Sequence, residues 1–165
     1  MKEGIIGSGD VAGALEPREG FLFFASGVSN SREERESEYE REKKLLLSQP
    51  RDKHIVYFGS LCVFYADTRY SKHKREMEEL IKENFTNYTI VRLGNITWGD
   101  NPHTIINFFK RQKSIGVPFE VQNTERYIVD KEEFLHWIHN IPEWSCEINI
   151  PGKRMKVVDI IKEYV

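Results

Sequence analysis

The chain has 165 residues and a mass of 19.4 kDa, a length that fits one domain and leaves little room for two. Hydrophobic residues make up 39% and charged residues 30%, with a mean hydropathy of -0.54, which argues against a membrane-embedded or disordered chain. The formal net charge is -2, so no global basic field attracts nucleic acid, and any anionic ligand must be held locally.

Cysteine and apolar patterns predict the setting of the protein. Cys62 and Cys146 form no C-x-x-C pair, so neither a disulfide framework nor a zinc site is indicated. We interpret the His136 and His139 pair as part of a helix surface, and we expect no metal. The N-terminal stretch lacks the long apolar region of a secretory signal, and no other segment has the pattern of a membrane-spanning helix. We therefore expect a reduced, cytoplasmic location, with neither membrane nor nucleic acid as a partner.

The first third of the chain alternates between apolar and charged segments. Residues 4–9 predict a short strand that enters a glycine turn, and residues 10–15 predict one or two helical turns. Residues 21–25 are continuously apolar, which is typical of a strand covered on both faces. Residues 32–44 are almost all charged, with both signs interspersed, and predict a mostly solvated helix to which we assign no function.

The rest of the chain continues the alternation of strands and helices. The predicted elements are a strand over 54–58 that ends at Ser60, an amphipathic helix over 70–85, a strand over 88–93, a helix over 102–111 that Asn101 caps, a strand over 127–129, a helix over 131–139, a strand over 147–150 and a last helix from 157. This order predicts an α/β fold with a mostly parallel sheet and helices on both faces.

A glycine-rich turn follows the first predicted strand. Gly7-Ser8-Gly9-Asp10-Val11-Ala12 satisfies the pattern G-x-G-x-x-[GA], in which glycine lets the backbone approach a pyrophosphate at a helix N-terminus. The alternative is a plain strand-to-helix turn in which Asp10 caps its own helix. An aspartate cap would place negative charge where the phosphates would bind.

Tyr70 and Lys74 are four residues apart on the amphipathic helix and share one face. A cation there would stabilise tyrosinate and lower the phenol pKa from about 10 toward neutrality, which would make Tyr70 usable as a general acid or base. Ser60 at the adjoining strand end could share the proton. The alternative is a core tyrosine beside a surface lysine.

Three segments in order carry a family resemblance. They are Ile55-Val-Tyr-Phe-Gly-Ser60, Tyr70-Ser-Lys-His-Lys74 and Ile90-Val-Arg-Leu-Gly-Asn95, and together they resemble the extended short-chain dehydrogenase/reductase family of nucleotide-sugar epimerases and dehydratases. Arg126-Tyr-Ile-Val-Asp130 is similar to the segment in which that family closes its sheet. The resemblance implies a Rossmann-like NAD(P)-binding domain over residues 1–165, with a reduced C-terminal substrate region from about 118.

The resemblance also implies roles for individual residues. Ser60, Tyr70 and Lys74 would be catalytic, with Tyr70 exchanging a proton with a sugar hydroxyl while hydride passes to or from NAD or NADP. Tyr70 and Lys74 would also contact the cofactor. The other cofactor-binding residues would be Gly7, Gly9, Asp10, Val11 and Ala25. Asn95 and Arg126 would contact a nucleotide-sugar or related substrate.

The sequence also departs from the family. The second and third strands of the usual cofactor half are missing, so the adenosine side lacks its acidic residue, and the first strand should lie at a sheet edge. Two functions therefore stay open: an NAD(P)-dependent epimerase/dehydratase-like oxidoreductase, or a non-catalytic binding or regulatory module on the same fold. A shortened form of a longer protein would also explain the missing strands. The few apolar residues in 32–44 predict a monomer or weak homodimer.

Overall fold

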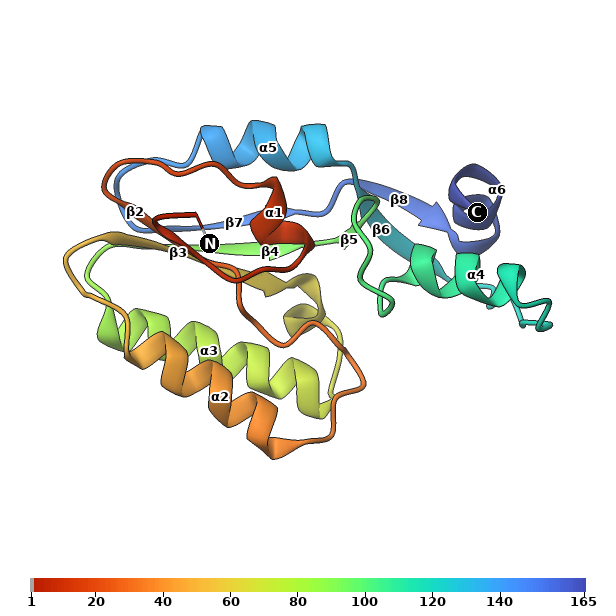
Figure 1. Cartoon of the computed structure of the whole chain (residues 1–165), viewed down its shortest axis with the longest axis horizontal. Helices are drawn as coiled ribbons and strands as arrows, with labels where there is room; N and C mark the ends of the chain where they lie inside the picture. Colours follow the sequence, from red (N-terminus) through yellow and green to blue (C-terminus); the bar gives the residue numbers. More distant parts are fainter. Residues whose placement is uncertain (1) are drawn as a thin grey trace.

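The computed structural model describes residues 2–165, in which strands and helices alternate largely as predicted (Figure 1). The elements are β1 (Ile5–Ile6), α1 (Asp10–Ala14), β2 (Phe21–Phe24), α2 (Glu36–Leu47), β3 (His54–Ser60), the 3₁₀ helix η1 (Leu61–Phe64), α3 (Arg69–Asn84), β4 (Tyr88–Leu93), β5 (Asn95–Ile96), α4 (Ile105–Ser114), β6 (Glu125–Val129), α5 (Lys131–His139), β7 (Cys146–Ile150), β8 (Lys153–Lys156) and α6 (Val157–Tyr164).

The main sheet has five strands in the order β1-β2-β3-β4-β7, and every neighbouring pair is parallel. All four residues of β2 are buried, as expected for a strand whose two faces are both covered. The expectation of a mostly parallel sheet is confirmed. The expectation that the first strand lies at an edge is also confirmed, because β1 pairs only with β2 among the described residues.

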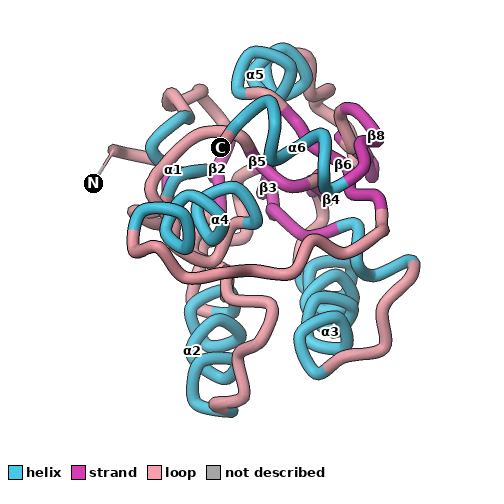
Figure 2. The backbone as a smooth tube through the Cα atoms, turned by 90° about the vertical axis from the view of Figure 1, so that its right-hand side faces the viewer, coloured by secondary structure: helices cyan, strands magenta, loops and turns pink. Residues whose placement is uncertain are grey.

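Helices cover both faces of this sheet, with α2 and α3 on one side and α1 and α5 on the other (Figures 1 and 2). Side chains alternate between the two faces along each strand. On β3, Tyr57 packs toward Met77 of α3, whereas Val56 and Phe58 belong to the core that holds Phe134 of α5. Two apolar layers therefore hold the carboxyl ends of the parallel strands in fixed positions.

A second, three-stranded sheet lies beside the first, in the order β5-β6-β8, with β6 and β8 antiparallel. It packs with α4 and α6 through a small core of Ile106, Ile128 and Ile160. The expectation that the segment 126–130 closes the main sheet is wrong. β7 takes that place, because Thr89 of β4 pairs with Cys146 at the start of β7, while β6 is occupied by β5 and β8.

Two helix boundaries differ from the sequence-based expectation. The helix expected over 102–111 begins at Ile105, because the Thr104 hydroxyl accepts the Asn107 N–H at 3.2 Å and caps it, while the Asn101 side chain accepts the His103 N–H. The charged helix expected from residue 32 begins at Glu36. The sequence did not predict β5, β8 or η1. None of the helices within residues 2–165 is long and apolar enough to cross a membrane.

Candidate functional site

A cavity of about 1320 Å³ opens at the carboxyl ends of β1, β2, β3 and β4 and reaches the second sheet. Parallel α/β sheets bind ligands at this end of the strands. The sequence-predicted site residues that line it are Gly9, Asp10, Val11, Ala25, Ser60, Tyr70, Lys74, Asn95 and Arg126. A smaller hollow of about 880 Å³ between α2 and α3 holds none of them. One cavity therefore gathers segments more than 100 residues apart in the chain.

Ser60 is the last residue of β3 and the N-cap of η1. Its Oγ accepts the Cys62 backbone N–H at 3.2 Å. This bond fixes the hydroxyl oxygen and leaves the hydroxyl hydrogen available to a ligand in the cavity. The local fold thus places the serine at the strand end, where the sequence predicted it.

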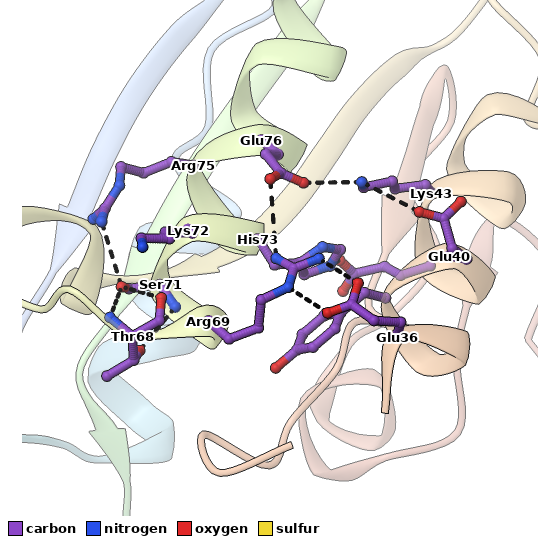
Figure 3. Close-up of polar contacts among 12 residues, drawn as sticks. Glu36, Glu40, Lys43, Thr68, Arg69, Ser71, Lys72, His73, Arg75 and Glu76 are labelled. Atoms are coloured by element: carbon purple, nitrogen blue, oxygen red, sulfur yellow. Dashed lines mark hydrogen bonds and ion pairs between the residues drawn. The ribbon is translucent and has the colours of Figure 1, made fainter. Parts of the chain in front are cut away.

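Tyr70 and Lys74 lie one turn apart at the start of α3. A capping box fixes this helix start, because the Thr68 hydroxyl accepts the Ser71 N–H and the Ser71 hydroxyl accepts the Thr68 N–H (Figure 3). Lys74 Nζ lies 5.3 Å from the centre of the Tyr70 ring and 5.7 Å from the centre of the Tyr57 ring. The expected pairing of a phenol with a cation on one helix face is present.

The expected lowering of the Tyr70 pKa is not found. Burial raises the pKa of Tyr70, and the nearby Lys74 ammonium lowers it by less, so the net shift is upward. The negative charge of Glu42 adds to the upward shift. The surroundings therefore favour the protonated phenol, the opposite of the expected effect.

Glu42 is the site residue that the sequence analysis missed. It lies on α2, the helix to which no function was assigned, and it is fully buried. Its Oε1 accepts the Val28 backbone N–H at 2.7 Å and faces Lys74 Nζ at 3.3 Å, while its Oε2 pairs with His73 Nε2. The signal was the spacing of Tyr39, Glu42 and Leu46, which puts a carboxylate in the buried stripe of a charged helix.

Ion pairs join α2 and α3 around this buried network (Figure 3). Arg69 pairs with Glu36 at 2.7 Å, and Lys43 bridges to Glu76 at 2.9 Å. Figure 3 shows His73 between these two surface bridges, directed from α3 toward α2. The outer pairs therefore hold together the two helices that supply Glu42 and Lys74.

The alternative for the glycine turn, in which Asp10 caps its own helix, is not found. The N-cap of α1 is Gly9, and no side chain in the described part of the chain makes a capping hydrogen bond to this helix. The Asp10 carboxylate instead accepts the backbone N–H groups of Asp100 at 3.0 Å and Asn101 at 2.9 Å. Gly99 has φ +88°, and a Cβ there would lie 2.0 Å from the Asp10 carboxylate carbon. The carboxylate is thus directed at the loop after β5 and does not cap its own helix.

Gly7 lies behind the turn and is not among the residues that line the cavity. Its φ is +128°, and a Cβ would lie 2.3 Å from the Ala25 carbonyl oxygen. Glycine is therefore required for the ends of β1 and β2 to approach each other. Its assignment to cofactor binding stays a prediction.

The second sheet supplies the other wall of the cavity. Asn95 Nδ2 donates to the Tyr127 carbonyl at 3.0 Å, and Arg126 donates to the Thr124 hydroxyl at 3.0 Å. Arg154 of β8, which the sequence analysis did not identify, also lines the cavity and pairs with Glu125 at 2.6 Å. The Lys and Arg residues of the lining outnumber the Asp and Glu residues by five to three, so the local environment is basic although the whole chain is acidic.

Known proteins resemble this chain in structure but not in sequence. No protein-family model matches the chain, and no curated protein sequence matches it. Solved structures do. WbmG of Bordetella bronchiseptica in complex with NAD is 14% identical with a TM-score of 0.67, covering 87% of this chain and 54% of that one. The fold is Rossmann-like.

Two further structures support the same fold. A dTDP-4-dehydrorhamnose reductase from Bacillus anthracis in complex with NADP is 13% identical with a TM-score of 0.71, covering 88% of this chain and 61% of that one. A UDP-glucose 4-epimerase from Thermotoga maritima with UDP-glucose is 13% identical with a TM-score of 0.64, covering 87% and 59%. The chain spans a little over half the length of these proteins. In the usual Rossmann order 3-2-1-4-5-6 the first strand is internal, whereas β1 is at the edge here.

Proposed function

We propose that this protein is an NAD(P)-dependent oxidoreductase of the epimerase/dehydratase or reductase type that acts on a nucleotide sugar. The observation that carries the proposal is the convergence of Ser60, Tyr70 and Lys74 with the glycine turn on one cavity. The similar solved structures support it, because WbmG binds NAD and the Bacillus anthracis reductase binds NADP.

The residues present fit such a cofactor at its nicotinamide and pyrophosphate ends. Gly9 has no side chain at the turn, and the Asp10 carboxylate is already bound by two amides of the loop after β5. Residues 2–165 place no strand beyond β1, so the chain itself supplies little to hold an adenosine. The residues present therefore fit the nicotinamide and the pyrophosphate but not the adenosine.

The chain's own groups then have distinct tasks. When bound, the nicotinamide supplies the hydride donor or acceptor. Tyr70 Oη transfers a proton to or from the reacting sugar hydroxyl or carbonyl oxygen, and the Ser60 hydroxyl donates a hydrogen bond to the same oxygen. Lys74 keeps N–H donors for the ribose hydroxyls and favours the Tyr70 phenolate when the proton leaves. Arg126, Arg154 and Asn95 bind the nucleotide sugar from the second sheet.

The alternative is a binding or regulatory module that has lost turnover. The position of β1 at the sheet edge favours it, since the adenosine half is absent from this sheet. The two functions differ in whether a dinucleotide binds and whether the phenol matters.

Calorimetric titration with NAD, NADH, NADP and NADPH, beside a thermal-shift series, tests the proposal. A ligand that binds only the folded state raises its stability by RT ln(1 + [L]/Kd). We expect one dinucleotide to bind with a Kd below about 100 micromolar. Absence of binding by all four at millimolar concentration would overturn the oxidoreductase and favour the binding module.

A further inference from the structure

The proposed chemistry uses Lys74 and leaves the fully buried Glu42 without a role. A carboxylate is costly to bury, and it is kept in a protein interior by partners that compensate its charge. Glu42 has three such partners: a backbone N–H from the loop after β2, a ring nitrogen of His73 and the Lys74 ammonium. Val28 and Lys74 also line the cavity, and Lys74 is the charged one of the two.

We propose that Glu42 is the positioning residue of Lys74: its carboxylate fixes the ammonium between Tyr57, Tyr70 and the cavity and leaves the remaining N–H donors for the ligand. The proposal rests on the proposed function for the identity of that ligand. The position of Lys74 relative to Glu42 and Tyr70 does not depend on it.

The contacts of Lys74 support this role. An ammonium carries three N–H donors, and within residues 2–165 Nζ has one hydrogen-bond acceptor, Glu42 Oε1 at 3.3 Å. The backbone at Gly27 lies close to both groups, because a Cβ there would be 2.4 Å from Glu42 Oε1 and 2.8 Å from Lys74 Nζ. The ammonium is thus confined on one side by the carboxylate and the loop, with the cavity on the other.

Glu42 is itself held in place. The Val28 N–H and His73 each bind a different carboxylate oxygen, and His73 is fully buried against the Tyr39 ring at a centroid distance of 4.5 Å. The titratable groups around Lys74 are Glu42 and Tyr39 from α2, Tyr57 from β3, Cys62 from η1 and Tyr70 from α3, while His73 of α3 pairs with Glu42. Glu42 is the acidic member of this set, and it raises the pKa of both Lys74 and Tyr70.

Glu42→Gln is the sharpest variant because it removes the charge with the smallest change of shape. Its Oε1 can still accept from Val28 and Lys74, but a neutral oxygen holds an ammonium more weakly than a carboxylate does. Its amide NH₂ can donate to His73 Nε2 only after the ring proton moves to Nδ1, which has no hydrogen-bond partner among the described residues. Glu42→Asp keeps the charge but withdraws it by one methylene. Glu40→Gln is the matched control, since Glu40 is exposed on the same helix and pairs with Lys43.

The experiment measures two quantities for each variant: the Kd for NADH and NADPH by calorimetry, and the titration of Tyr70 by ¹³C NMR of labelled tyrosine, assigned with Tyr70→Phe. For Glu42→Gln we expect the Kd to rise by about ten-fold or more, because an ammonium that is no longer held by a carboxylate leaves its position at the ligand. We also expect the pKa of Tyr70 to rise, because the Lys74 ammonium, which lowers that pKa more than Glu42 raises it, moves away from the phenol. Glu40→Gln should change neither.

The outcomes separate this proposal from the proposed function. If the wild-type protein binds no dinucleotide, the oxidoreductase assignment fails, and the Tyr70 titration alone decides whether Glu42 acts on the site. A folded Glu42→Gln protein in which the Tyr70 pKa is unchanged or lowered overturns the positioning role, because the ammonium has then stayed beside the phenol. If Glu42→Gln does not fold, Glu42→Asp replaces it, and wild-type values of both Kd and Tyr70 pKa in that variant overturn the role equally.

Discussion

Helix α3 carries two buried charged side chains one turn apart, Lys74 and Glu78, and their surroundings differ. Glu78 pairs with Arg92 of β4, which also pairs with Glu147 of β7 at 2.8 Å and donates toward Asn149. The guanidinium is thereby occupied by protein acceptors. Within residues 2–165, Lys74 pairs with Glu42 alone and lines the cavity at the strand ends.

The two ion pairs of α3 therefore have different roles, one in stability and one at the candidate site. The pair of Glu78 and Arg92 ties α3 to β4 and lines the smaller hollow between α2 and α3, not the cavity at the strand ends. The pair of Glu42 and Lys74 ties α3 to α2 and retains donors for a ligand. Breaking the first pair should mainly lower stability, whereas changes around the second should mainly alter binding and proton transfer.

The largest expected effect is on turnover in Tyr70→Phe, which removes a hydroxyl from the site and leaves the ring. We expect turnover of the nucleotide sugar to fall by about a hundred-fold or more. The free energy of unfolding in urea should change by less than about 1 kcal/mol. Tyr88→Phe on β4 is the matched control and should leave both unchanged. Full activity in Tyr70→Phe would remove this phenol from the mechanism.

The pair of Glu78 and Arg92 is tested by Glu78→Gln. The side chains of Glu78 and Arg92 are 6% and 10% exposed, so loss of the carboxylate leaves a nearly buried guanidinium undercompensated. We expect the free energy of unfolding to fall by about 2–4 kcal/mol. The Kd for the dinucleotide should stay at its wild-type value in the folded variant. Glu79→Gln, at an exposed pair with Lys82, should cost less than about 0.5 kcal/mol.

The pair of Glu42 and Lys74 should also affect the pH dependence of the free energy of unfolding. Burial raises the pKa of Glu42, but Lys74 and His73 outweigh it and hold that pKa at about 2, below the usual 4.5. A carboxyl with a depressed folded-state pKa stabilises the fold above its unfolded pKa and loses that contribution as the pH falls. Relative to Glu42→Gln, the wild-type protein should lose about 3 kcal/mol between pH 4.5 and 2. Parallel denaturation curves for the two proteins over that range would contradict this.

Local patterns predicted the main sheet and most of the helices. The apolar run of 21–25, the strand of 88–93 and the helix of 131–139 are all present, because period and composition determine whether a segment is buried. The convergence of Ser60, Tyr70 and Lys74 was predictable because a strand end and the first turns of a helix meet at the same sheet edge. The second sheet could not be predicted in this way, since its strand Asn95–Ile96 is too short to show the alternating pattern of a strand.

Glu42 and Asp10 show why side-chain partners were harder to predict. Glu42 lies in a run of charged residues, and only the packing of α2 against α3 reveals that one of them is buried. The sequence offered Asp10 a place at the pyrophosphate turn or, as the alternative, the cap of its own helix, but the partners of its carboxylate are 90 and 91 residues away. No local pattern contains such a partner, so these contacts required the fold.

The smallest expected effect concerns Asp10. It tests whether the carboxylate at the glycine turn affects ligand binding or only the stability of the fold. Asparagine offers one acceptor oxygen where Asp10 uses two, so one of the Asp100 and Asn101 N–H groups would face an NH₂ group. We expect Asp10→Asn to lower the free energy of unfolding by about 1 kcal/mol. Because the carboxylate charge is already engaged by two amides, the Kd for the dinucleotide should change by less than about three-fold. A ten-fold gain in affinity would mean that the carboxylate charge reaches the phosphates after all, and the turn would then be one that disfavours a dinucleotide.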